Sequence, residues 1–203
     1  MIELWDLRTG TPKTSWKGHD TNTAVSLAFT RDSRTLISGS WQNMKTWNLN
    51  TYAEQKMVWQ SNPRVALSPS GRLLAAGGNL PVGITFRTIP ELKELLTIRG
   101  HKDAVWTVAF SPDSKTLATA SWDGTVKLWH VATGQELLSF NAGGGVAWSV
   151  AFSPDSRLLA FGSGSASKSE ITLVRSATRD DVLKEHAAEL RPSPKANLRA
   201  LNP

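Results

Sequence analysis

The chain has 203 residues, 40% of them hydrophobic and 20% charged, so it can bury a core and lacks the composition of a disordered protein. It has no cysteine, which excludes disulfides, thiol catalysis and cysteine-built zinc sites and fits a reducing compartment. The net charge of +6 invites a nucleic-acid interpretation, but the basic residues are scattered rather than clustered with aromatics, which favours a solvated, mildly basic surface.

The first predicted elements, residues 2–17, contain the pair Trp5-Asp6, the first of several markers that recur along the chain. Further tryptophans follow at Trp47 and Trp129, 42 and then 82 residues on. The pair Gly18-His19 recurs as Gly100-His101, again 82 residues later. Unrelated markers that share one period of about 41 residues indicate a repeat architecture.

A seven-residue strand-and-turn motif keeps the same period along the chain. Its clearest copy is Val-Ala-Phe-Ser-Pro-Asp-Ser, and its four copies span residues 27–33, 65–71, 108–114 and 150–156. The last three copies are separated by 43 and 42 residues. Ser-Pro-Asp-Ser fits a type I turn with proline at its second position, so each copy predicts a strand followed by a tight turn.

The copy that begins near residue 104 predicts four short strands. They span residues 104–110, 116–121, 125–131 and 136–140, and Asp123-Gly124 is a two-residue hairpin signal between the second and third. Four antiparallel strands in about 42 residues make one propeller blade. Such a blade cannot bury both of its faces alone, so it is stable only between neighbours.

These residues resemble the WD40 repeat family, and the sequence is most similar to bacterial WD40 repeat proteins. The resemblance covers residues 2–175, and its most specific copy runs from Gly100 to Trp129. Where the family has Trp-Asp at the end of the third strand, this chain has Trp5-Asp6, Trp47-Asn48, Trp129-His130 and finally Val174-Arg175. The resemblance implies an all-β, WD40-type β-propeller.

We expect about four full four-stranded blades plus a partial N-terminal blade, which together form an incomplete ring. The WD40 repeat region would span residues 1–178, with the partial blade at 2–17 and blades at 18–60, 61–99, 100–141 and 142–178. Blade 61–99 is the most degenerate. Residues 179–203 are expected to form a C-terminal helix with a disordered tail, similar to the helix that ends WD40 regions in some bacterial signalling proteins.

The number of blades leaves the predicted ring open. WD40 rings usually close with about seven blades, which at this period needs about 290 residues. An open ring would leave two apolar blade faces uncovered, and exposed patches of that size bind or aggregate. We therefore expect either that the chain is the C-terminal part of a larger propeller or that two chains assemble into one ring.

The resemblance also implies a buried hydrogen-bond network in each well-formed blade. In blade 100–141 it would join His101, Thr119, Asp123 and Trp129, whose polar groups can satisfy one another away from water. A hydroxyl, a histidine and an aspartate could also suggest nucleophilic catalysis, but the repeat motif already explains them. Blade 18–60 keeps His19, Ser38 and Trp47 but has Gln42 at the aspartate position, so we expect its network to be incomplete.

Tryptophan is abundant, with nine in the chain. Four of them would lie on the top face of the propeller, beside the central channel: Trp41, Trp106, Trp122 and Trp148. A tryptophan buries a large rigid area with a polar handle, which makes it a common interface anchor. These side chains could contact a partner, or they could simply pack neighbouring loops.

No motif in the sequence points to catalysis. There is no phosphate-binding loop, no His-Glu-x-x-His and no clustered metal set, so we expect no enzyme activity, no catalytic residue, no cofactor and no metal. We expect a cytoplasmic, non-catalytic scaffold for protein or peptide partners, with possible self-association or a missing propeller half, and neither a nucleic-acid nor a membrane partner. Alternatives are a regulatory, kinase-linked segment of a bacterial signalling protein and a non-functional gene fragment.

Overall fold

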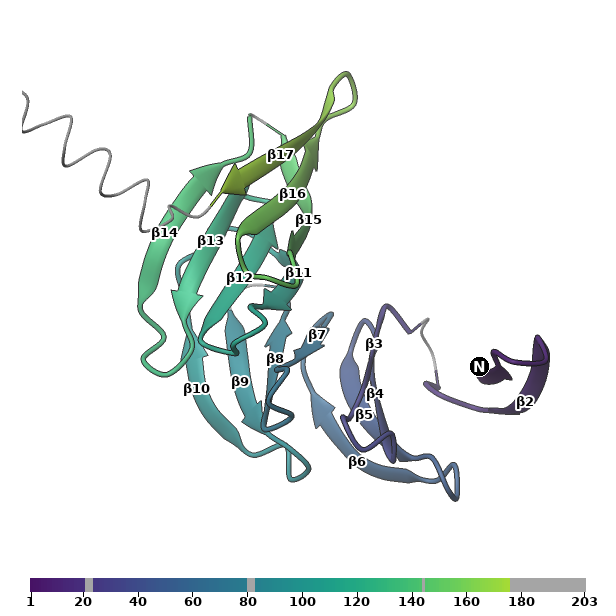
Figure 1. Ribbon diagram of the computed structural model, residues 1–203. Helices are drawn as coiled ribbons and strands as arrows, with labels where there is room; N and C mark the ends of the chain where they lie inside the picture. The colour runs from purple at the N-terminus through teal and green to yellow at the C-terminus, as the bar shows by residue number, and fades with distance from the viewer. Residues whose placement is uncertain (21–23, 80–82, 144, 176–203) are drawn as a thin grey trace, which may run out of the picture.

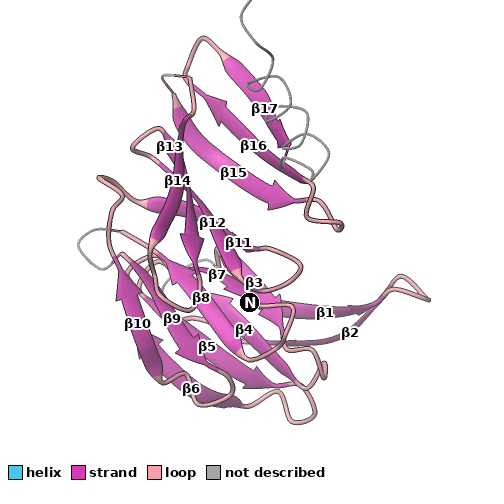
Figure 2. Cartoon of the chain, turned by 60° about the vertical axis from the view of Figure 1, so that its left-hand side comes forward, coloured by secondary structure: helices cyan, strands magenta, loops and turns pink. Residues whose placement is uncertain are grey.

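The computed structural model describes residues 1–20, 24–79, 83–143 and 145–175, which form 17 strands in five antiparallel sheets (Figure 1). These residues contain strands and loops and no helix, which confirms the all-β prediction (Figure 2). The helix and tail expected at 179–203 lie outside the described residues.

The sheets follow one another in chain order, and each is a meander in which consecutive strands pair. The first sheet contains β1 (Ile2–Asp6) and β2 (Thr11–Trp16). The second contains β3 (Ser26–Phe29), β4 (Thr35–Gly39), β5 (Asn43–Asn48) and β6 (Glu54–Trp59). The third contains β7 (Arg64–Leu67), β8 (Leu73–Gly77), β9 (Ile84–Thr88) and β10 (Glu94–Ile98).

The last two sheets differ in the number of their strands. One contains β11 (Val105–Phe110), β12 (Thr116–Ser121), β13 (Thr125–His130) and β14 (Glu136–Asn141). The other contains β15 (Val146–Phe152), β16 (Leu158–Gly164) and β17 (Ser169–Arg175). A fourth strand, which the sequence predicted for this last blade, would fall beyond Arg175 and outside the described residues.

The first strands of successive sheets lie side by side, so the sheets stack like blades around a common centre. Strand β7 contacts β3 on one side and β11 on the other, and β11 in turn contacts β15. The stack is an arc and not a closed ring, because β1–β2 and β15–β17 lie at its two ends (Figures 1 and 2). The structure is therefore an open, propeller-like arrangement.

A repeated turn connects the first and second strands of each larger sheet. At Ser111–Ser114, the Ser111 hydroxyl donates to Asp113, and the same carboxylate accepts the backbone N–H of Lys115. The last residue of the turn, Ser114, has a φ of 63°, in the left-handed region, and Ser33, Gly71 and Ser156 repeat this conformation. The repeated Ser-Pro-Asp-Ser motif is thus a hydrogen-bonded turn that joins two strands.

Apolar side chains fill the space between neighbouring sheets. Between the second and third sheets, Ile37 and Met44 pack with Val65 and Leu74. Equivalent clusters join the third sheet to the fourth and the fourth to the fifth. Each sheet therefore presents one apolar face to the sheet before it and another to the sheet after it, and the core consists of these interfaces.

This packing predicts a clear difference between two methionines of the second sheet. Replacing the buried Met44 by Ala removes apolar volume from an interface between sheets and should lower the free energy of unfolding by about 2–5 kcal/mol. Met57→Ala is the matched control, because Met57 is exposed on β6 and its truncation should cost less than about 0.5 kcal/mol. Urea denaturation of both variants measures the difference, and equal losses would contradict this account of the core.

Candidate functional site

Four side chains of the fourth sheet form a buried hydrogen-bond chain. The indole N–H of Trp129 donates to Thr119 Oγ1 at 2.9 Å, and Thr119 Oγ1 lies 2.7 Å from His101 Nε2. His101 Nδ1 lies 2.9 Å from Asp123 Oδ2. The ionised Asp123 carboxylate can only accept, so Nδ1 carries the hydrogen and donates to it, and in the neutral ring Nε2 accepts from the Thr119 hydroxyl. The four residues grouped from the sequence are thus brought together, with His101 neutral.

A second network of the same kind exists in the sheet β3–β6, and here the expectation of an incomplete network was wrong. Trp47 donates to Ser38 Oγ at 2.8 Å, and Ser38 Oγ lies 2.8 Å from His19 Nε2. The acceptor for His19 Nδ1 is Asn43 Oδ1, at 2.7 Å. Because the hairpin is one residue shorter than at Asp123-Gly124, the first residue of β5 supplies the acceptor in place of Gln42.

Burial sets the protonation states of these networks. Desolvation by burial lowers the pKa of His101 and of His19 below the ordinary value, which keeps both rings neutral at pH 7. Burial alone would raise the pKa of Asp123. Hydrogen bonds from Thr125, the Lys102 backbone N–H and His101 together outweigh that effect and lower this pKa to about 2.

The networks are closed to substrates. The hydroxyls of Thr119 and Ser38 belong to completely buried residues, and each already accepts an indole N–H and faces a histidine nitrogen. A nucleophile needs access to a reacting atom, and these hydroxyls have none. The Thr–His–Asp set therefore stiffens a sheet and does not form a reaction centre.

The third sheet replaces this network with a different one. Strand register places Arg87 where the other sheets have Trp47 and Trp129, because it pairs with Leu74 as they pair with Leu36 and Leu117. Arg87 forms a salt bridge of 2.8 Å with Glu94 on β10. The degenerate pattern of residues 61–99 carries no sequence signal for this buried arginine.

The same edge of each four-stranded sheet carries a salt bridge between its third and fourth strands. Lys45 lies 2.7 Å from Glu54, and Lys127 lies 2.9 Å from Glu136. The two glutamates are equivalent to Glu94, but both lysines lie two residues before the position that Arg87 holds in the third sheet. Each of the two lysines also lies over the tryptophan of its own strand. Sequence reasoning missed these pairs, although a Glu at the start of every fourth strand was a signal for them.

Three of the four predicted top-face tryptophans form one cluster, in which Trp122 and Trp148 are exposed and Trp106 is half-buried. The ring of Trp106 stacks on that of Trp122 with centroids 5.2 Å apart, and its centroid is 5.7 Å from that of Trp148 in an edge-on arrangement. The Trp122 and Trp148 centroids are 6.1 Å apart. The guanidinium of Arg64 lies 3.9 Å over the Trp106 ring. We call Trp106, Trp122 and Trp148 the tryptophan cluster.

Trp41 stands apart from the tryptophan cluster. Its side chain is exposed, and among the described residues it makes no ring contact with the other three. Its carbonyl accepts the backbone N–H of Asn62, which ties its loop to the start of the third sheet. The structure therefore brings together three of the four tryptophans that the sequence grouped.

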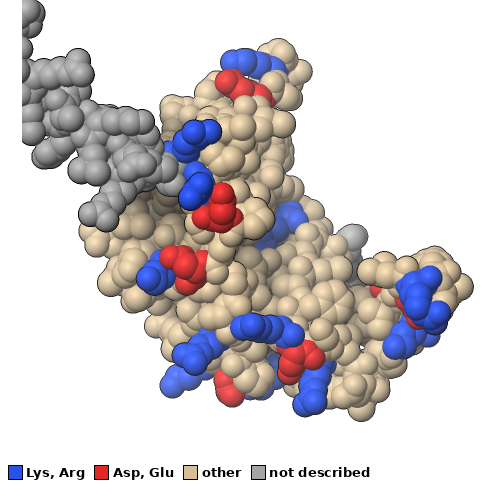
Figure 3. Space-filling model, in the orientation of Figure 1, with Lys and Arg blue, Asp and Glu red and all other residues tan. Residues whose placement is uncertain are grey.

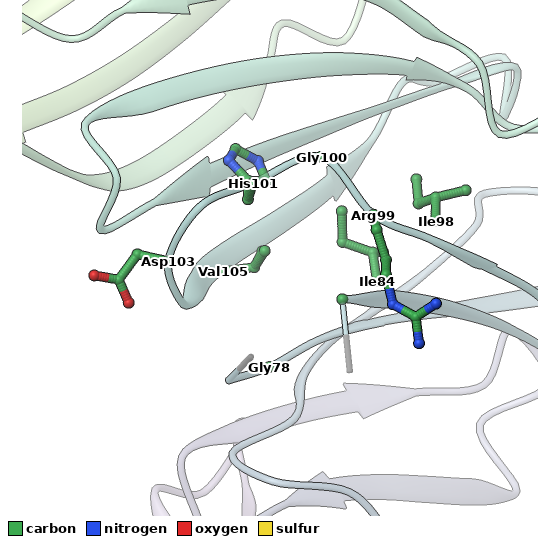
Figure 4. A pocket seen from close by; sticks show the side chains of 9 residues that line it. Gly78, Ile84, Ile98, Arg99, Gly100, His101, Asp103 and Val105 are labelled. Atoms are coloured by element: carbon green, nitrogen blue, oxygen red, sulfur yellow. The ribbon is translucent and has the colours of Figure 1, made fainter. Parts of the chain in front are cut away.

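One cavity lies beside the tryptophan cluster, and another lies beside His101. A hollow of about 420 Å³ begins at Trp122 and continues along the loops that carry Asp123, Asn141 and Ser165. A smaller pocket, of about 220 Å³, lies between the third and fourth sheets and is lined mainly by glycines and by Ile84, Ile98 and Val105 (Figure 4). Asp103 points away from these apolar side chains, so the smaller pocket presents a mostly apolar wall (Figure 4).

The face shown in Figure 3 carries no concentrated patch of one charge. Lys and Arg are scattered in small groups over the face shown in Figure 3, several of them beside Asp or Glu. Within the described ranges, no three His, Asp or Glu residues gather as metal ligands would. Nor do those ranges contain a helix of the length and hydropathy needed to cross a membrane.

Comparison with known proteins matches much of the chain to one family. The family model for the WD40 repeat ("WD domain, G-beta repeat") matches residues 10–48, 92–130 and 134–169, together more than half of the chain. Periodic tryptophan protein 2 of Arabidopsis thaliana is 30% identical over 137 residues, which cover 64% of this chain and 15% of that protein. The target of rapamycin complex subunit wat1 of Schizosaccharomyces pombe is 42% identical over 66 residues, 32% of this chain and 21% of that protein.

A solved structure shares the fold. The crystal structure of the computationally designed Ika4 protein matches with a TM-score of 0.67 and 20% identity, over 80% of this chain and 96% of that one. The chain spans only about a fifth or less of the two curated relatives named above. Both relatives are eukaryotic, so they give no support to the expected bacterial resemblance.

The pKa shift of Asp123 predicts a specific loss of stability in acid. A carboxyl whose pKa is about 2 in the folded chain and 3.8 when unfolded stabilises the fold above pH 4, and this contribution is lost as the pH falls toward 2. Asp123→Asn should remove that component while lowering the free energy of unfolding at pH 7 by about 1–3 kcal/mol, because buried donors lose a partner.

Urea denaturation at several pH values between 7 and 2 checks this prediction. Asp103→Asn is the matched control, since Asp103 is exposed and lies outside the network, and it should keep the wild-type profile. The histidines should add a separate loss below about pH 6.5 in every variant, because the unfolded chain binds protons that buried His19 and His101 resist. An unchanged acid limb in Asp123→Asn would contradict the account.

Proposed function

Because the chain belongs to the WD40 repeat family, we propose that it is a non-catalytic scaffold that binds protein or peptide partners. The observation that carries this proposal is the tryptophan cluster, which exposes large aromatic side chains at one end of the sheets. One relative is named as a subunit of a complex, which fits a role in assemblies. The buried Thr–His–Asp set is closed to substrates and supports no competing catalytic function.

The tryptophan cluster has the properties of an interface anchor. Trp122 and Trp148 are large, rigid and exposed, although each already contacts two other indoles. The Arg64 guanidinium lies over the Trp106 ring, and its Nη1 donates to the Val25 carbonyl at 2.9 Å. Side chains that are fixed before binding lose little conformational entropy when a partner docks, so their contacts convert efficiently into affinity.

The hollow beside Trp122 could accommodate a further part of a bound peptide. The polar side chains of Asn141 and Ser165 line it, next to the indole of Trp122. A peptide that stacks an apolar side chain on the cluster could place polar groups in this hollow, which is the usual combination of anchor and orientation. Trp41 lies outside the cluster and would make a separate contact in this proposal.

Three more specific expectations concern a larger propeller, a kinase-linked regulatory role and a non-functional gene fragment. The chain covers only a small part of its relatives, which supports the proposal that this scaffold is one part of a larger propeller. A bacterial, kinase-linked regulatory role draws no support from these relatives. A non-functional gene fragment predicts that no peptide binds selectively to the tryptophan cluster.

Selection from a displayed random-peptide library, with the folded protein as bait, tests the proposal. Peptides that bind the wild type should bind the Trp122→Ser and Trp148→Ser variants at least about tenfold more weakly, because each loses an anchor. Trp59→Ser is the matched control, since Trp59 is an exposed tryptophan on β6, outside the cluster, and this variant should bind like the wild type.

Stability measurements on the same variants separate contact from packing. Thermal unfolding midpoints of Trp122→Ser and Trp148→Ser should stay close to that of Trp59→Ser if the cluster serves a partner. Equal peptide binding by all three variants, the absence of any selected peptide, or collapse of the fold in the cluster variants alone would each contradict the proposal.

A further inference from the structure

Two outward faces, one on the last sheet and one on the β3–β6 sheet, repeat the interfaces inside the arc. One face of each sheet is marked by the residue three positions before the Trp position of its third strand. Met44, Ile84 and Val126 hold this place in three sheets and are at most 1% exposed, because the next sheet covers them. Ile171 holds it in the last sheet and is 79% exposed. We call this surface, with Leu173, the trailing face.

The opposite face shows the same series in reverse. Val65, Val108 and Val150, on the first strands of three sheets, are 4 to 8% exposed because the preceding sheet covers them. Leu27 is their equivalent on β3, paired with Ser38 as Val108 is with Thr119, and it is 56% exposed. Phe29, two residues on, is exposed as well. We call Leu27 and Phe29 the leading face.

Inside the arc, these two kinds of face always pack against each other. Met44 lies in one cluster with Val65, Ile84 in one with Val108, and Val126 in one with Val150. Each internal interface therefore joins the trailing face of one sheet to the leading face of the next. The two ends of the chain carry one uncovered copy of each half.

We propose that a second copy of this chain docks head to tail, with its leading face on the trailing face of the first. The pairing of Ile171 in one copy with Leu27 in the other reproduces the contact that Val126 makes with Val150 within the chain. A contact between different surfaces is heterologous, so it either closes into a ring or continues as an open chain of copies. The proposal is independent of the tryptophan cluster, which carries the proposed function.

One strand pair stands in the way of a complete interface. The hairpin β1–β2 covers the outer part of the leading sheet, where Ile2 packs with Leu36 and Trp47. It forms a two-stranded sheet of its own, so it shares no strand pairing with the sheet it covers. Docking of β15–β17 therefore requires displacement of this hairpin, at the cost of the contacts that Ile2 and Trp16 make with the β3–β6 sheet.

Light scattering coupled to size-exclusion chromatography, over a range of concentrations, tests the proposal with single charge substitutions. The wild type should increase in mass with concentration. Ile171→Lys and Leu27→Lys should both remain monomeric, because a lysine on an apolar interface must be desolvated without a partner. Leu95→Lys is the matched control, since Leu95 is equally exposed but lies on β10, away from both end faces, and it should associate like the wild type.

Mixing the two blocked variants identifies the head-to-tail arrangement. Ile171→Lys keeps an intact leading face and Leu27→Lys an intact trailing face, so an equimolar mixture should form a one-to-one dimer although each variant alone is monomeric. A wild type that stays monomeric up to its highest soluble concentration would overturn the proposal. So would a mixture that stays monomeric while the wild type associates, or a Leu95→Lys variant that fails to associate.

Discussion

The structure depends on one constraint, which is that each small antiparallel sheet has two apolar faces and can cover neither by itself. Every internal sheet satisfies the constraint by packing between two neighbours, as Val108 and Val126 do on opposite faces of the fourth sheet. Stability is then a sum of interfaces between nearest neighbours. At Leu27 and Ile171 no neighbouring sheet covers the apolar face, so the stabilisation that such an interface provides is missing there.

Because the sheets pack against each other, polar side chains buried between them need hydrogen-bond or charge partners within the protein. A Trp at the end of a third strand brings a buried indole N–H, which needs an acceptor, and the hydroxyl and the histidine beyond it complete the chain of bonds. The acceptor at the end can be charged, as Asp123 is, or neutral, as Asn43 is. Where Arg87 replaces the Trp, its positive charge is paired with the carboxylate of Glu94 on the next strand. The second, third and fourth sheets thus pair these buried polar side chains with different sets of residues, and Arg87 Nε is left without a hydrogen-bond partner.

The period of about 41 residues was sufficient to predict the fold class, and the strands expected at 104–140 agree with β11–β14 to within a residue at most boundaries. The grouping of His101, Thr119, Asp123 and Trp129 also follows from a motif in one repeat. Asn43 was missed because a hairpin one residue shorter shifts which side chain faces His19. The separation of Trp41 from the other three indoles could not be predicted, because it depends on how neighbouring loops are placed in space and not on spacing along the chain.

Hydrogen exchange of the backbone amides, measured sheet by sheet in dilute solution, tests the nearest-neighbour account most directly. Sheets covered on both faces should open least, so amides of β8 and β12 should be the most protected, those of β4 and β16 less, and those of the β1–β2 hairpin least. Uniform protection across all five sheets, or protection of β1–β2 equal to that of β12, would contradict the claim that covered faces hold the molecule together.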